Sequence, residues 1–157
     1  MYNVTIYIIL LLFINNQIAL TQEQGTMSGS IKFSSPTTVL PPYGAYSHAA
    51  VVSAGSRLLF TSGQVGETPD AVIPETVEEQ YRVALNNIVC ILADNGVSPK
   101  NIVKITTYLV SPIAPDKMRK IREDAFGDIA PAATLIFVPK LAGPKYLVEI
   151  EAVAALD

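Results

Sequence analysis

The sequence has one cysteine, Cys90, one histidine, His48, and no tryptophan among its 157 residues. A single cysteine excludes a disulfide within the chain, and a single histidine excludes the clustered signatures of the usual zinc sites. We therefore expect no metal centre. Cys90 has no adjoining Lys, Arg or second Cys, so we expect it to be a small, buried, unreactive side chain. A lone histidine is more often a hydrogen-bonding strand residue than a base.

Charge is also sparse. Only 16% of the residues are charged, the net charge is -3, and the 11 Lys and Arg residues form no basic run. Nucleic acid is therefore an unfavourable partner on electrostatic grounds. Half of the residues are hydrophobic, which excludes a disordered chain and indicates a well-filled core together with a buried subunit contact.

The longest apolar run, VTIYIILLLFI at residues 4–14, is too short to span a bilayer as a helix. Its length suits the apolar part of a secretory signal, but the first Lys or Arg is Lys32, whereas a signal begins with positive charge. Two interpretations stay open: residues 1–21 are a signal and the protein is secreted, or Met27 is the working start and the protein is cytoplasmic. Either way, residues 1–26 are set aside and residues 27–157 are expected to form one domain.

The first half of that domain predicts short strands. Ile31–Phe33 is expected to form an edge strand before the turn residues at 34–36. Two further apolar runs, Ala49–Ala54 and Leu58–Ser62, flank a Gly55-Ser56 turn and predict a β-hairpin.

The middle of the chain predicts helix, strand and helix. From Thr76 the apolar period becomes helical, with Thr76 and Glu79 spaced as a capping box and Gly96 as the stop. Ile102–Val110 alternates as a strand, with Val103, Ile105 and Leu109 on one face and Lys104, Thr106 and Tyr108 on the other. A second helix is expected at about Pro115–Phe126, with Met118, Ile121 and Ala125 inward and Gly127 as its end.

The C-terminal stretch, Pro131 to Ala154, reads as two apolar strands across a turn, and so as a second hairpin. Glu149 and Glu151 stand two residues apart in its last strand, so both carboxylates project from one face, about 7 Å apart. The order of elements predicts a single α+β domain: a mixed sheet with both helices on one face.

The other face of that sheet is expected to carry Thr106, Tyr108, Leu147, Glu149 and Val153. This mixture is too apolar to be fully wet in a monomer and too polar for a core. A closed symmetric oligomer would cover it, and sites at such contacts are built from two chains.

The chain resembles the Rid family, the RidA/YjgF imine deaminases, from about residue 31 to 157. The resemblance lies in the motif TSGQ (residues 61–64), in VEIEAVA (148–154), and in the order and spacing of GAYSHA, NIVKITTYLV and PAATLIFVPKL. It implies a chorismate-mutase-like α+β fold with a mixed six-stranded sheet, and a homotrimer with ligand sites between subunits. It also implies hydrolysis of reactive enamines and imines to carbonyl products and ammonia, without a cofactor.

The resemblance assigns roles to individual residues. Glu149 matches the glutamate that holds the attacking water, and Tyr46 matches a tyrosine that lines the pocket. Ser62 and Gly63 match the turn on the pocket wall. Backbone amides near Thr134 and Leu135 would bind the substrate's acid group, and Arg119 aligns with a family asparagine on the second helix.

One departure from the family pattern bears on activity. Where active deaminases read Pro-Ala-Arg-Ser, this chain reads Pro131-Ala132-Ala133-Thr134. The arginine that Ala133 replaces makes a paired bond to the substrate carboxylate, typically worth about 1.5–3 kcal/mol. Two functions follow: a deaminase for small imines, or a non-enzymatic trimeric module that binds a small metabolite. RNA cleavage, sometimes ascribed to the family, is poorly supported because the chain lacks a basic surface and a histidine pair.

Overall fold

The computed structural model describes residues 31–156; the expectations about residues 1–26 and Met27 fall outside this range. The chain forms, in order, β1 (Ile31–Ser34), β2 (Ala49–Val52), β3 (Arg57–Phe60), β4 (Gln64–Val65), α2 (Val77–Asp94), the short 3₁₀ helix η1 (Pro99–Asn101), β5 (Ile102–Leu109), α3 (Pro115–Phe126), β6 (Ala132–Phe137) and β7 (Val148–Leu156). Within residues 31–156, neither α2 nor α3 is long and apolar enough to cross a bilayer.

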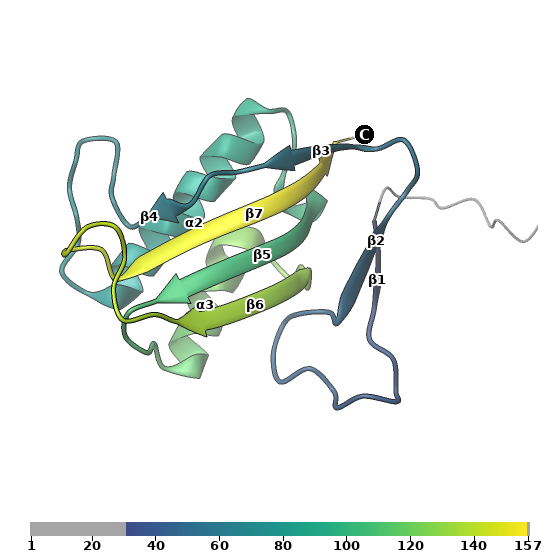
Figure 1. Ribbon diagram of the computed structural model, residues 1–157. Coiled ribbons are helices and arrows are strands. Elements are labelled where there is room, and N and C mark those ends of the chain that lie inside the picture. Colours follow the sequence, from purple (N-terminus) through teal and green to yellow (C-terminus); the bar gives the residue numbers. More distant parts are fainter. Residues whose placement is uncertain (1–30, 157) are drawn as a thin grey trace, which may run out of the picture.

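The main sheet is mixed and five-stranded, in the order β3-β7-β5-β6, with β4 also paired to β7. Both long helices lie behind it and the other face is open (Figure 1). This is the predicted α+β architecture of a chorismate-mutase-like fold. The prediction of one six-stranded sheet was wrong, because β1 and β2 pair with each other in a separate two-stranded ribbon.

Strand β7 is the centre of the main sheet. It pairs antiparallel with β5 along one edge and with β3 and then β4 along the other. The predicted C-terminal hairpin was therefore wrong, since β5 lies between β6 and β7. The reason is that α3 carries the chain back to the start of β5, so that the next strand, β6, runs parallel to β5.

The predicted hairpin of residues 49–62 was also wrong, because each of its two strands pairs with a different strand. β2 pairs with β1, in the register Ala49 opposite Ser34, whereas β3 pairs with β7, with Arg57 opposite Leu156. The Gly55 turn does form, with φ of 90° and a bond from the Ser56 amide to the Ser53 carbonyl. The strands on either side of the turn, however, diverge.

Both helices begin and end at the predicted signals. The side chain of Thr76 accepts a hydrogen bond from the Glu79 amide, and Gly96 has a φ of 74°. α3 begins at Pro115 and ends before Gly127, which has a φ of 73°. These positive φ values are strained for any residue but glycine.

The core lies between the helices and the sheet, and three side-chain placements differ from the predictions. Ile102 rather than Val103 is fully buried, because the β5 register shifts between Ile102 and Lys104. Leu147 packs against the core instead of lying on the open face. Cys90 is exposed, because it is two residues, or about 200°, around the helix from Ile88 and Leu92.

Gln80 is a buried polar residue that joins α2 to the segment entering β7. Its side-chain amide nitrogen donates to the carbonyls of Pro74 and Lys145, at 2.8 and 2.9 Å, and its oxygen accepts from the Leu147 amide at 2.8 Å. The side-chain nitrogen and oxygen of Gln80 thus make nearly all the hydrogen bonds they can make, which is what allows a glutamine to be buried here.

We expect Gln80→Leu to destabilise the protein by at least about 2 kcal/mol, because it leaves two carbonyls and one amide without their partner in a nearly dry site. Chemical denaturation followed by circular dichroism measures this. Asn86→Leu, at an exposed position of the same helix, is the matched control and should change stability by less than about 0.5 kcal/mol. Equal effects of the two substitutions would show that the Gln80 contacts contribute nothing specific.

Candidate functional site

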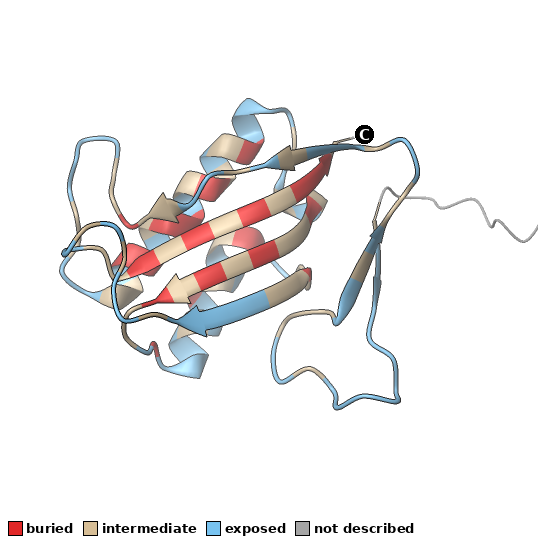
Figure 2. Ribbon diagram, viewed as in Figure 1, coloured by how far each residue is buried: buried red, intermediate tan, exposed pale blue. Residues whose placement is uncertain are grey.

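The open face of the sheet carries a mixed polar and apolar row of side chains. Every second residue is buried from Ile105 to Leu109 in β5 and from Val148 to Ala154 in β7 (Figure 2), and the residues between them point away from the helices. The register places Tyr108 between Glu149 and Ile136, and Thr106 between Glu151 and Thr134. Both carboxylates of β7 therefore lie on the open face, as predicted.

Glu149 lies directly against Gly63, in the break between β3 and β4. A β-carbon added at Gly63 would fall 1.9 Å from Oε1 of Glu149 and 2.9 Å from its Cγ. Three residues, 61–63, span the two β7 positions between Ile150 and Val153, so this is a bulge with one extra residue. The bulge and the missing side chain together make room for the carboxylate.

The bulge is held by its own hydrogen bonds. The Thr61 amide donates to the Ala152 carbonyl at 3.0 Å, and the Thr61 hydroxyl accepts from the Ala152 amide at 2.9 Å. The side-chain amide of Gln64 donates to the carbonyls of Ser62 and Gly63, at 3.3 and 3.2 Å. The predicted site residues Ser62 and Gly63 thus lie beside Glu149 in a bulge that these hydrogen bonds hold in place.

Tyr108 lies opposite Glu149 in the strand register and is hydrogen-bonded to Glu151. Its hydroxyl donates to Glu151 at 3.3 Å. Desolvation first, then the charge and hydrogen bond of Glu151, and then the charge of Glu149 raise the pKa of Tyr108 above its ordinary value. The tyrosine therefore stays a neutral hydrogen-bond donor beside two acidic groups.

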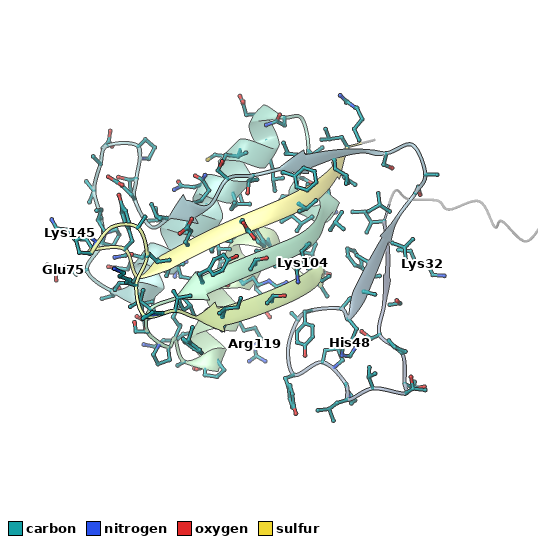
Figure 3. The ribbon with its side chains drawn as sticks, in the orientation of Figure 1. Lys32, His48, Glu75, Lys104, Arg119 and Lys145 are labelled. Atoms are coloured by element: carbon teal, nitrogen blue, oxygen red, sulfur yellow. The ribbon has the colours of Figure 1, made fainter. Side chains whose placement is uncertain are left out.

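Next to this pair is a shallow hollow of about 280 Å³, lined by Phe60, Thr61, Lys104, Thr106, Glu151, Ala152 and Val153. Lys104 donates to Thr134 across β5 and β6, and it is labelled over the open face in Figure 3. Lys104 and Glu151 were not among the predicted site residues. The alternation of β5 already placed Lys104 on this face, but its neighbour Thr134 depended on a strand pairing that was wrongly predicted.

Tyr46 lies in the segment that docks on the start of β6. The neighbouring Ser47 donates from its amide to the Pro131 carbonyl at 3.1 Å and from its hydroxyl to Ala130 at 2.7 Å. Tyr46 packs edge-on against His48, with ring centroids 5.9 Å apart. His48 is exposed and its amide donates to Ser35.

The remaining predicted residues lie on the helix side of the sheet. Ala133 pairs with the buried Ile105 and packs against the core, and Leu135 pairs with the buried Thr107. Arg119 is exposed on α3 (Figure 3). One chain therefore holds Glu149, Gly63 and Thr134 on the open face but Ala133 and Leu135 on the opposite one.

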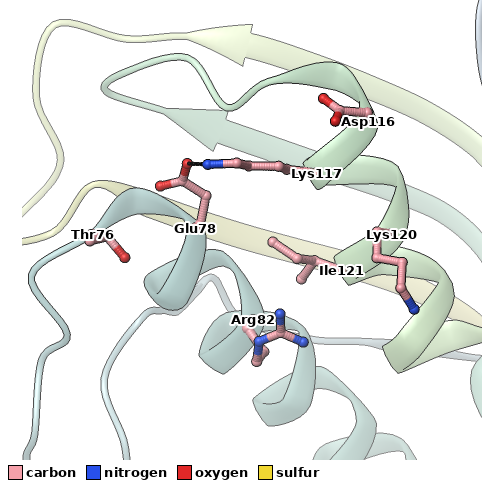
Figure 4. A pocket seen from close by; sticks show the side chains of 7 residues that line it. All are labelled: Thr76, Glu78, Arg82, Asp116, Lys117, Lys120 and Ile121. Carbon is pink, nitrogen blue, oxygen red and sulfur yellow. Dashed lines mark hydrogen bonds and ion pairs between the residues drawn. The ribbon is translucent and has the colours of Figure 1, made fainter.

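A larger groove of about 660 Å³ lies between the start of α2 and α3 (Figure 4), away from the open face. Two of its lining residues, Lys117 and Glu78, form an ion pair at 3.2 Å, and a third, Arg82, pairs with Asp124 at 3.7 Å; all four side chains are at least partly exposed. Solvent-exposed pairs of this kind contribute little to the stability of the fold, and they do not by themselves indicate a binding site. Within residues 31–156, His, Cys, Asp and Glu side chains gather in no group of three that could hold a metal ion.

Comparison with known proteins identifies the family. Residues 37–156 match the family model described as Endoribonuclease L-PSP. A RutC family protein of Pyrococcus abyssi is 33% identical over 116 residues, which cover 72% of this chain and 87% of that protein. A rat protein named 2-iminobutanoate/2-iminopropanoate deaminase is 34% identical over 114 residues, covering 71% of this chain and 80% of the rat protein.

Solved structures agree with this. The Rid protein YyfB of Yersinia pestis superimposes with a TM-score of 0.72 at 28% identity, covering 82% of this chain and all of that one. Escherichia coli TdcF with bound serine superimposes with a TM-score of 0.58 at 26% identity, covering 80% and 99%. From its sequence and its fold alike, this chain belongs to the Rid family.

Proposed function

We propose that this protein hydrolyses small reactive imines and enamines to carbonyl products and ammonia, with Glu149 holding the attacking water. The observation that carries the proposal is the placement of the Glu149 carboxylate against Gly63 on the open face of the sheet. Membership of a family that includes the rat and mouse proteins named 2-iminobutanoate/2-iminopropanoate deaminase supports it.

The chemistry requires only water and a carboxylate. Water adds to the carbon of the C=N bond and gives up a proton as it attacks, and the imine nitrogen gains a proton. The resulting carbinolamine then expels ammonia and leaves a C=O group. A carboxylate that accepts a hydrogen bond from the water aligns its lone pair and takes up the proton in the transition state. Tyr108, whose hydroxyl donates to Glu151, lies opposite Glu149 in the strand register.

We further propose that the working form is a homotrimer with its sites between copies. The open face leaves Phe60 and Ile136 exposed, at 69% and 41%, an apolar surface of the kind that a subunit contact covers. The side chain of Leu135 lies on the opposite side of the sheet from Glu149, and its backbone amide would serve the site. Tyr46, Ser62, Thr134 and Arg119 would complete the pocket. The cellular compartment stays a prediction.

Ala133 favours a second candidate, a non-enzymatic module that binds a small metabolite. Without a guanidinium at this position, a 2-imino acid loses the partner that its carboxylate would have. The same feature suits an imine or enamine that has no carboxylate, which keeps the enzyme as the first candidate. The description Endoribonuclease L-PSP finds no support in the net charge of -3.

The first prediction concerns the carboxylate. We expect Glu149→Gln to lower the rate of imine hydrolysis by about 100-fold or more, because an amide cannot take the proton from water. Ammonia release is followed with 2-iminopropanoate, 2-iminobutanoate and a carboxylate-free imine generated in situ. The matched control is Glu151→Gln, two residues along the same face. Loss of activity in Glu151→Gln alone would show that Glu151, and not Glu149, holds the water. If the unmodified protein does not accelerate ammonia release, the binding module is favoured.

The second prediction concerns the room made by Gly63. A methyl group at this position would overlap the Glu149 side chain, which can rotate away because it is flexible. We therefore expect Gly63→Ala to keep its melting temperature within a few degrees but to lose at least about 10-fold in activity, as a misplaced base transfers protons poorly. Gly44→Ala, where an added β-carbon meets nothing within 4 Å, should be unaffected. An active Gly63→Ala would contradict the proposed water position.

The third prediction concerns Ala133. Restoring the guanidinium with Ala133→Arg should raise kcat/KM for 2-iminopropanoate by about 10-fold or more, which corresponds to about 1.4 kcal/mol of new carboxylate binding. The control Ala133→Met has similar length without charge and should give no gain. A gain from both variants would assign the effect to packing instead of carboxylate recognition.

A further inference from the structure

The β1–β2 ribbon lies apart from the main sheet. It stands beyond the end of that sheet, roughly across the direction of its strands (Figure 1). The segment that leads into β2 lies beside the start of β6, where Ser47 is hydrogen-bonded to Ala130 and Pro131. The segment that follows β2 leads to β3, which Arg57 begins opposite Leu156. β2 therefore passes along the end of the sheet, from the side of β6 to the side of β3.

This crossing prevents β2 from pairing with β3 of its own chain. β3 and β6 are separated by three strand spacings, about 14 Å. The four residues of β2 cover about 13 Å when extended, and all of that length is used in the crossing. β2 could lie along its own β3 only if Ser47 released the start of β6. Within one chain, the Ser47 contact and a β2–β3 pairing exclude each other.

The outer edge of β3 is consequently open. Among residues 31–156, β3 pairs with β7 alone. The Thr61 amide points to β7, and backbone groups alternate along a strand, so the N–H and C=O groups of Leu58 and Phe60 point to the open edge. Both side chains are exposed, at 45% and 69%. A bare apolar edge is a template for pairing with another chain.

We propose that β2 of one copy pairs antiparallel with the open edge of β3 in a second copy, so that the copies exchange their β1–β2 arms. The pairing would place Val51 opposite Leu58 and Ala50 opposite Leu59. In this register Ala50, Val52 and their β1 partners Ile31 and Phe33 share a side with Leu59, which packs against the core. The apolar side of the arm thus extends the core layer of the neighbouring copy.

The sequence itself selects a second copy as the occupant of this edge. The strand that fits β3 in length and apolar pattern is the one four residues before it, joined by a turn that already has a hairpin hydrogen bond. Exchange makes the same contacts as a closed hairpin while it keeps the Ser47 contact in each chain, which is the usual basis of domain swapping. It needs no particular substrate and is independent of the proposed activity.

Mixed disulfide formation tests the exchange. In a Cys90→Ser background, a tagged Val51→Cys chain is co-expressed with an untagged Leu58→Cys chain and oxidised. We expect a covalent tagged–untagged pair on a non-reducing gel, because paired strands bring these positions within disulfide range. The matched control replaces Leu58→Cys with Val72→Cys, at a residue as exposed as Val51, 57% against 55%, and should give no pair.

The doubly substituted chain, with Val51→Cys and Leu58→Cys together, decides between exchange and a closed hairpin. Exchange predicts covalent oligomers, whereas an internal disulfide in a monomer would overturn the proposal, as would the absence of any disulfide in the mixed chains. Hydrogen exchange on the unmodified protein is a second measurement. The amides of Leu58 and Phe60 should lose their protection on dilution; protection that persists in the monomer would also overturn it.

Discussion

The hydrogen-bonded pairing of β7 with β3, β4 and β5 is the interaction on which the rest of the structure depends. It fixes which residues of β7 are buried and which face outward, because neighbouring residues of a strand point to opposite sides. A shift by one residue would bury Glu149 and Glu151 and expose Val148 and Ile150. The alternation of charge and apolar residues in β7 therefore specifies the sheet register and the position of the candidate site together.

The bulge at residues 61–63 depends on this pairing. β7 is paired regularly with β3 and with β4. The extra residue lies in the segment between β3 and β4, and Gly63 there leaves space for a carboxylate where another residue would have placed a side chain. Gly63 is needed here for space and not for a positive φ. The feature that makes Glu149 available to solvent or ligand is therefore an irregularity in the opposite strand, and Glu149 itself lies in regular β structure.

Local signals in the sequence were sufficient for the helices but not for strand pairing. Thr76, Pro115, Gly96 and Gly127 act within one helical turn of themselves, so the bounds of α2 and α3 could be read directly. Both predicted hairpins were wrong because each joined strands that are neighbours in sequence, whereas β7 lies next to β5 and β3, which precede it by dozens of residues. Long-range pairing is decided by burial of the whole sheet. The carboxylates on the open face were predictable from alternation alone, but the Gly63 contact needed the bulge.

The order of the strands has a consequence during synthesis of the chain. β7 follows the other strands in sequence yet occupies the middle of the sheet. While a nascent chain still lacks it, β3 and β4 have nothing to pair with in the main sheet, and β5 can pair only with β6. An incomplete chain on the ribosome thus exposes several strand edges at once, the state in which chains aggregate most readily. Addition of β7 closes those edges together, which makes the stage of synthesis just before β7 emerges the one at which a chaperone would matter most.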